Sequence, residues 1–170
     1  MFGVLNTIIQ MIQQYDLNLE EILGGELEYL SVIDKLQKRE EFGEWLLKTA
    51  HKMNQAINQE RDITTRQVIQ QAKQYIMDNY QNPDLSVEMI CRHLHMSPAY
   101  FSTMFKKETG QAYIAYLTEI RLNKAVELLN KTDDKTYVIA SKVGYQEQNY
   151  FSYVFKKKFG VSPTKFRGAR

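Results

Sequence analysis

Serine and lysine side chains stand at matching positions in two stretches of the sequence that are fifty residues apart. The pattern Y-F-S-x-x-F-K-K-x-x-G begins at Tyr100 and is repeated from Tyr150. Hydroxyl groups can bond to base edges, and lysine ammonium groups can bind phosphates, so these residue types suit contact with DNA. Agreement over an eleven-residue pattern indicates one structural unit used twice.

Paired phenylalanines predict that each copy is a helix with a buried back. Phe101 and Phe105 are four residues apart, as are Phe151 and Phe155, and residues at this spacing lie on one side of a helix. The serines and most of the lysines then fall on the other side. Two short helices, each with a buried aromatic side and an exposed, polar and lysine-rich side, favour a protein that contacts two segments of DNA, one with each helix. We call these two helices the reading helices.

A further short helix is predicted before each of these reading helices. Ser86 is the expected N-cap of the first one, and Ser97 followed by Pro98 is a typical start for the first reading helix. In the connecting turn, the second copy has Gly144, which readily adopts positive φ, where the first copy has His95. The short helices repeat at an offset of 49 residues and the reading helices at 50. Two short helices joined by a tight turn match a helix-turn-helix motif.

A long helix is expected between the two motifs, from about residue 112 to residue 129. Its apolar seam includes Ile114, Leu117 and Leu128, and Arg121 lies within that seam. A guanidinium in such a place needs partners, and two alternatives are open. Arg121 either bonds to carboxylate or backbone carbonyl groups inside the protein, or it contacts a DNA phosphate.

Charge is distributed unevenly along the chain. Residues 1–65 contain six basic and eleven acidic residues, a net charge of −5, whereas residues 66–170 contain sixteen and nine, a net charge of +7. This asymmetry points to a polyanion-binding domain with an appendage. We predict a helical linker or regulatory fragment over residues 1–62, as the end of a longer domain, and a DNA-binding domain over residues 63–170. The polar segment 58–66 is the predicted boundary.

Helical periodicity also runs through the first region. It covers residues 3–15 and 27–36, with a break at the glycines 24–25, and residues 42–57 carry a continuous apolar stripe. A stripe at this spacing predicts a strongly amphipathic helix. That helix either faces the core of a small domain, or forms a dimer or passes a signal, and the sequence leaves both open. Thr65 is the expected N-cap of the helix that follows.

Residues 66–170 resemble the DNA-binding domain of the AraC/XylS family of bacterial transcription regulators. The resemblance implies an all-α fold in which seven helices form two helix-turn-helix motifs joined by a long helix. Residues 1–60 are similar to the helical region that precedes this domain in family members of the two-component response-regulator type. The resemblance is carried by residues 19–25 and 44–46 in the first region, and by residues 97–102, 105–110, 121–122, 125, 128–129, 139–140, 143–145, 150–152 and 155–163 in the domain.

The resemblance implies a sequence-specific transcription regulator, expected to be an activator, with two helices in successive major-groove segments. Gln148 and Asn149 suit adenine through paired amide hydrogen bonds, and Ala99 and Thr103 suit thymine methyl groups. The base-reading residues implied by matching motif positions are Pro98, Ala99, Ser102, Thr103 and Lys106 in the first helix, and Gln148, Asn149, Ser152, Tyr153 and Lys156 in the second. The candidate phosphate-binding residues are Lys107, Lys157, Lys158, Lys165 and Arg167.

No catalytic, metal-binding or cofactor-binding residues are predicted, and an enzyme is not expected. His51, His93, His95 and Cys91 lack the spacing of a metal site. The expected partners are double-stranded DNA, RNA polymerase and a second copy of the chain bound through residues 42–57. No membrane-spanning segment is expected, and the single cysteine fits a cytoplasmic location. The alternative function is a helical protein–protein adaptor that uses the same apolar stripe.

Overall fold

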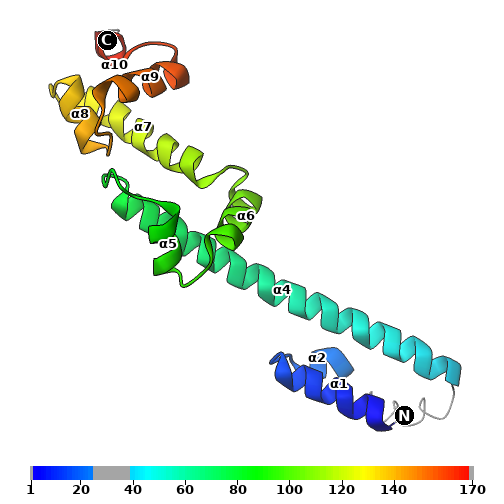
Figure 1. Ribbon diagram of the computed structural model, residues 1–170. Coiled ribbons are helices and arrows are strands. Elements are labelled where there is room, and N and C mark those ends of the chain that lie inside the picture. The colour runs from blue at the N-terminus through cyan, green and yellow to red at the C-terminus, as the bar shows by residue number, and fades with distance from the viewer. Residues whose placement is uncertain (1, 25–38, 169–170) are drawn as a thin grey trace. The chain divides into compact units, whose positions relative to one another are not determined.

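The computed structural model describes residues 2–24 and 39–168 of the 170-residue chain, and every regular element in those ranges is an α-helix (Figure 1). The all-α prediction is therefore confirmed. The chain divides into two compact units, residues 1–64 and 65–170. None of the described helices is long and apolar enough to cross a membrane. The helix expected over residues 27–36 lies outside the described residues.

In the first unit, three helices share a small apolar cluster. They are α1 (Phe2–Gln14), α2 (Leu19–Leu23) and the first part of α4 (Arg39–Asn79). The stripe over residues 42–57 contributes Met53 to the buried part of this cluster and packs other apolar side chains against it. This burial favours the core-facing interpretation of the stripe. The cluster contains Ile8, Ile12, Ile22, Leu23 and Met53, with Trp45, Leu46 and Ala56 packed against them.

The prediction that Thr65 caps a new helix is wrong, because Thr65 lies inside α4. Residues 58–66 are polar for the most part, but they contain neither Gly nor Pro, and all of them except Thr65 are exposed. Polar side chains that face water do not interrupt a helix, whereas a proline in its interior does. Polarity alone therefore does not locate the end of a helix.

The second unit contains the end of α4 and six further helices among its described residues. They are α5 (Val87–His93), α6 (Pro98–Thr109), α7 (Tyr113–Lys131), α8 (Thr136–Lys142), α9 (Gln148–Phe159) and α10 (Pro163–Gly168). The short helices α5 and α8 begin at residues 87 and 136, an offset of 49, and the reading helices α6 and α9 begin at residues 98 and 148, an offset of 50. These are the offsets that the sequence predicts.

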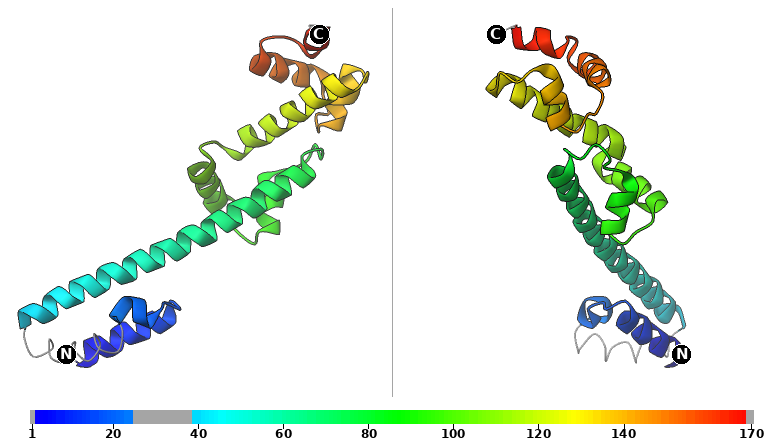
Figure 2. Two further views of the ribbon diagram at one scale, coloured as in Figure 1. Left: turned by 180° about the vertical axis from the view of Figure 1, so that it is seen from behind. Right: turned by 60° about the vertical axis from the view of Figure 1, so that its left-hand side comes forward.

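The long helix α7 contributes to two separate hydrophobic clusters. Its first half places Leu117 and Ile120 against α4, α5 and α6, and its second half places Leu122, Ala125 and Leu129 against α8 and α9. Within the second unit, α7 runs from the end of α6 to the start of α8 (Figures 1 and 2). Each helix-turn-helix motif therefore has its own core, and α7 is part of both.

The local features that predict the motifs are found in the structure. Ser86 and Ser97 are N-caps, since each side chain accepts a hydrogen bond at 3.4 Å from a backbone N–H in the first turn of α5 or α6. His95 and Gly144 have φ angles of 53° and 87° in the two connecting turns. All four paired phenylalanines of the repeats are 0% exposed. The prediction that the phenylalanine side of each reading helix packs into the core is confirmed.

Tyr113 connects the start of α7 to the loop before α5. Its hydroxyl donates a hydrogen bond to the Leu85 carbonyl oxygen at 2.7 Å. Burial raises the pKa of Tyr113 from 10.0 to about 12. Because this folded-state pKa is above the unfolded value, the unfolded chain loses the phenol proton first as the pH rises. The stability that depends on the neutral phenol is therefore present below pH 10 and lost as the pH passes 12.

Tyr113→Phe is expected to lower the free energy of unfolding by about 1 kcal/mol at neutral pH, because the variant loses one buried hydrogen bond. The difference between wild type and variant should shrink between pH 10 and pH 12, where the wild-type phenol loses its proton. Urea denaturation of both proteins across this range measures the difference. A difference that stays constant up to pH 12 would show that the neutral phenol does not stabilise the fold.

Candidate nucleic-acid interface

The helix α6 presents the first set of predicted base-reading residues to solvent. All five are exposed, whereas the paired phenylalanines of the same helix are 0% exposed. The Thr103 hydroxyl donates a hydrogen bond to the Ala99 carbonyl oxygen at 3.1 Å. This bond turns the hydroxyl toward its own helix and leaves the methyl group for an apolar contact. The five residues are Pro98, Ala99, Ser102, Thr103 and Lys106.

The helix α9 presents the second set at matching positions. Gln148, Asn149, Tyr153 and Lys156 are exposed, and Ser152 is half-buried. Gln148 and Asn149 are the first two residues of α9, so their amides lie at its N-terminal end. The N-terminal part of the second helix is the part that a helix-turn-helix directs at base edges.

The five predicted phosphate-binding residues differ in their exposure and in whether they already pair with another residue of the protein. Three have exposed side chains that form no ion pair with other described residues, and these are Lys107, Lys157 and Lys165. Lys158 places its Nζ atom 3.1 Å from Glu119 Oε1 in α7. Arg167 is half-buried, and its Nε and Nη2 atoms are enclosed without a hydrogen-bond partner among the described residues. We therefore expect weaker phosphate contacts from Lys158 and Arg167 than from the other three.

Glu119 is a residue that inspection of the sequence does not single out. Its carboxylate accepts hydrogen bonds from Gln111 Nε2 at 3.2 Å and from Lys158 Nζ at 3.1 Å. The Gln111 hydrogen bond, followed by the contact with Lys158, lowers the pKa of Glu119. Gln111 follows α6 and Lys158 belongs to α9, so Glu119 bonds to both motifs. No local pattern marks this contact, because Lys158 is 39 residues away in the sequence.

Arg121 is buried in the middle of α7, with 8% of its surface exposed. Its Nε donates to the Tyr80 carbonyl oxygen at 2.8 Å, and its Nη2 donates to the Asn82 carbonyl oxygen at 2.7 Å. Burial lowers the pKa of Arg121, but a guanidinium remains protonated at neutral pH. Of the two alternatives that the sequence leaves open, the internal one with backbone carbonyl partners is confirmed.

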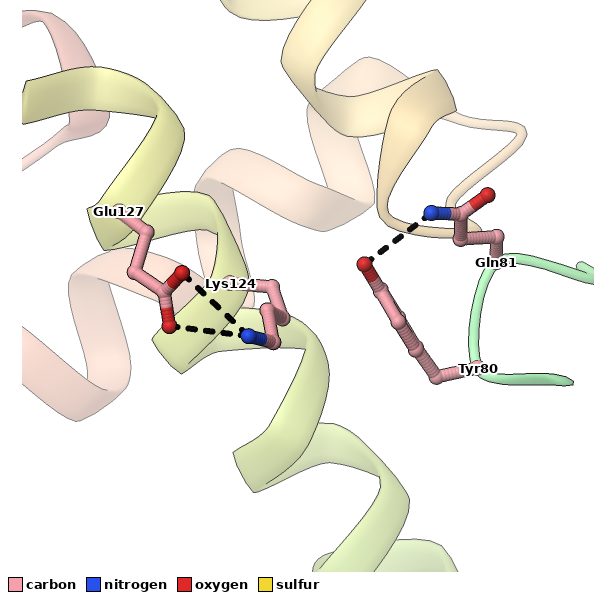
Figure 3. A network of polar contacts seen from close by, with 4 residues as sticks. All are labelled: Tyr80, Gln81, Lys124 and Glu127. Carbon is pink, nitrogen blue, oxygen red and sulfur yellow. Dashed lines mark hydrogen bonds and ion pairs between the residues drawn. The ribbon is translucent and has the colours of Figure 1, made fainter. Parts of the chain in front are cut away.

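An open hollow beside these contacts is lined by Tyr80 and Gln81, which follow α4, and by residues of α7 and α8. Within it, Lys124 Nζ is 3.1 Å from Glu127 Oε1, and the Tyr80 hydroxyl accepts a hydrogen bond from the glutamine that follows it (Figure 3). Lys142, also at the hollow, is 2.7 Å from Asp134. Because both lysines are paired with carboxylates, the hollow offers no unpaired lysine to an anionic ligand.

Cysteine, histidine and carboxylate residues do not gather into a site in the described ranges. No group of three or more of them could hold a metal ion in residues 2–24 and 39–168. Cys91 is buried in the core of the first motif, and burial raises the pKa of its thiol. A buried, protonated thiol packs as a small apolar side chain.

Comparisons with known proteins agree with this geometry. Residues 90–169 match the family model described as Helix-turn-helix domain. The solved C-terminal domain of AraT, a response regulator from Geobacillus stearothermophilus, is 44% identical with a TM-score of 0.59, and the match covers 61% of this chain and 85% of that one. The arabinose operon regulatory protein of Escherichia coli K12 is 30% identical over 122 residues, which are 72% of this chain and 40% of that protein. The transcriptional activator RhaR of Pectobacterium carotovorum is 40% identical over 80 residues, 47% of this chain and 28% of RhaR.

Two motifs with buried aromatic backs and exposed polar faces, joined by one long helix, define a double helix-turn-helix DNA-binding domain. The chain belongs to the AraC/XylS family of transcription regulators, which are not enzymes, and its second unit is the DNA-binding domain of that family. The resemblance of residues 66–170 to this family is thereby confirmed. The chain spans 40% or less of the length of the first curated relatives that it matches.

Proposed function

We propose that the chain is the DNA-binding part of a sequence-specific transcription activator, and that α6 and α9 enter successive major-groove segments of one duplex. The observation that carries this proposal is the repeat, since both helices bury their paired phenylalanines and expose residues at matching positions. An α-helix fits the major groove, where base edges can be distinguished. One chain would then read two segments about one helical turn apart, roughly 34 Å along the duplex.

The two helices are proposed to read different bases. Gln148 and Asn149 carry amides that can form paired hydrogen bonds with adenine. In α6, the bond between the Thr103 hydroxyl and the Ala99 carbonyl supports an apolar contact with thymine methyl groups. None of the ten predicted base-reading residues is an arginine, which is the commonest partner of guanine. The proposed target is therefore rich in A·T pairs.

The proposed activator role and the proposed role of the first region are supported by properties of the relatives. RhaR is a transcriptional activator, and activation implies a contact with RNA polymerase. AraT is a response regulator, which supports a regulatory role for residues 1–62 ahead of a DNA-binding domain over residues 63–170. A homodimer through residues 42–57 would use the exposed side of that helix, where Leu47 is 74% exposed.

Gln148→Ala is expected to change base preference at one or two positions of the target, with a loss of about 1–3 kcal/mol of discrimination there. Lys157→Ala is expected to weaken binding to all sequences similarly, because a phosphate carries no sequence information. The wild-type chain first selects its duplex from random DNA. Binding of both variants to a panel of duplexes, each with one position changed, then separates the two roles. Identical profiles for the two variants would refute the assignment.

A further inference from the structure

Arg121 stands where α7 passes from the core of one motif to the core of the other. Leu117 and Ile120 before it belong to the first cluster, and Leu122 after it belongs to the second. Tyr80, which follows α4, is a half-buried side chain that packs against both clusters. Arg121 and Tyr80 therefore both lie where the two motifs meet.

On the side of the first motif, Arg121 binds the turn that follows α4. Its two hydrogen bonds, 2.8 Å to the Tyr80 carbonyl and 2.7 Å to the Asn82 carbonyl, are made by different nitrogen atoms of one guanidinium. The Tyr80 carbonyl comes directly after the last residue of α4 and the Asn82 carbonyl lies in the turn beyond it. A hydrogen bond from a charged donor to such a carbonyl is stronger than one between neutral groups. The planar guanidinium donates in fixed directions, so these two bonds also fix the position of α7 against the turn that follows α4.

On the side of the second motif, the same guanidinium lies over an aromatic ring. The Arg121 Cζ atom is 5.4 Å from the centroid of the Tyr145 ring, which is within range of cation–π attraction. Tyr145 is buried, and its ring centroid is 5.4 Å from that of Phe151 in α9. One side chain thus contacts both the turn that follows α4 and a residue that packs on the second reading helix.

Gly144 brings the turn of the second motif directly onto these contacts. A Cβ atom at this position would lie 2.5 Å from the Tyr80 carbonyl oxygen and 2.9 Å from two guanidinium nitrogens of Arg121. Real Cβ atoms do not approach other atoms so closely, so glycine is required here by packing as well as by its φ of 87°. At Gly160, where φ is 78°, a Cβ atom would meet nothing within 4 Å. Close approach is therefore a property of Gly144 that Gly160 does not share.

We propose that Arg121, Gly144 and Tyr145 form a clamp that holds the two helix-turn-helix motifs in one orientation, so that the chain binds two DNA segments at one spacing. This inference rests on the proposed reading of DNA by α6 and α9. Two binding units held in one geometry bind a matching double site more tightly than either unit alone, and they lose that gain when the geometry does not match. Arg121 is a positioning residue, because it acts on DNA only through the motifs that it orients.

The dependence of affinity on spacing in the wild-type chain tests the clamp directly. The full 170-residue chain selects a duplex from random DNA, and its two half-sites are then moved apart or together by single base pairs. One base pair rotates a half-site by about 35° around the duplex, so we expect about a tenfold loss of affinity for a one-pair change. Equal affinity at several spacings would contradict the proposal that the clamp holds the motifs in one orientation. Failure to select any duplex would instead overturn the proposed function.

Gly144→Ala tests the clamp with Gly160→Ala as its matched control. Both substitutions put alanine at positive φ, but only the first places a Cβ atom against Tyr80 and Arg121. Gly144→Ala is expected to bind the double site about tenfold more weakly, with a broadened spacing preference and with single half-sites bound within about twofold of wild type. Gly160→Ala should keep the wild-type spacing preference. The wild-type preference in Gly144→Ala would overturn the clamp.

Arg121→Lys gives a second and independent variant, which decides the question if Gly144→Ala does not fold. Lysine keeps the positive charge but cannot donate to two carbonyl groups in fixed directions. The clamp predicts a broadened spacing preference in Arg121→Lys while each half-site is bound as by wild type. A spacing preference in Arg121→Lys as sharp as that of wild type would overturn the proposal.

Discussion

Phe155→Ala is expected to lower the free energy of unfolding by about 3–5 kcal/mol and to remove DNA binding by the second motif. Phe155 is 0% exposed, and its ring centroid lies 5.7 Å from Phe151, 4.6 Å from Phe159 and 5.5 Å from Phe166. Truncation to alanine would remove these contacts and leave a cavity that the surrounding helices fill only in part. A small domain has about 5–15 kcal/mol of stability in total, so this loss is a large share of it.

Tyr153→Ala is the matched control for Phe155→Ala, because Tyr153 is on the same helix but is 63% exposed. A change at an exposed position is expected to stay within about 0.5 kcal/mol of wild type. Urea denaturation followed by circular dichroism measures both variants. Equal losses in the two variants would contradict the packing of Phe155 as the aromatic back of α9.

The affinity of the chain for duplex DNA is expected to fall about 40- to 500-fold when the salt concentration rises from about 50 to about 200 mM. This range corresponds to three to five lysine or arginine contacts with phosphates, each of which releases a bound cation from the DNA. The candidates for these contacts are Lys107, Lys157, Lys158, Lys165 and Arg167. Measuring the dissociation constant at several salt concentrations gives the slope of its logarithm against the logarithm of salt concentration.

Substitutions at two adjacent lysines, Lys157 and Lys158, extend the salt measurement to individual phosphate contacts. Lys157→Ala should reduce the salt slope by about 0.9, the contribution of one phosphate contact. Lys158→Ala should reduce it less, because Lys158 Nζ already lies 3.1 Å from the Glu119 carboxylate. A salt-independent affinity would contradict the phosphate contacts as a group. A larger change of slope in Lys158→Ala than in Lys157→Ala would contradict the assignment of Lys157.

The repeat makes the architecture of the second unit predictable from sequence, because its signals are local. The Ser97 cap, the phenylalanines four residues apart and the positive φ of Gly144 each depend on a few neighbouring residues. The offsets of 49 and 50 residues then place the second motif by analogy with the first. Exposure of nine of the ten predicted base-reading residues follows from the same periodicity, whereas Ser152 is half-buried, and contacts of all ten with DNA remain predictions.

The contacts that orient the motifs are not predictable from sequence, because they join distant residues. Arg121 and its partner Tyr80 are 41 residues apart, and the sequence shows only that a cation lies in an apolar seam. Gly144 is marked by its turn position, but the lack of room for a Cβ atom depends on where α4 ends. The pairing of Lys158 with Glu119 is hidden for the same reason. The error at Thr65 has another cause, since a polar run does not distinguish an exposed helix from a linker.

The most direct test of DNA reading by two helices is a hydroxyl-radical footprint of the full chain on the duplex that it selects. We predict two protected segments centred about 10 base pairs apart on one face of the duplex. In Gln148→Ala, protection of the segment read by α9 should weaken while protection of the segment read by α6 stays as in wild type. A single protected segment, or two segments on opposite faces of the duplex, would contradict the reading of DNA by α6 and α9 together.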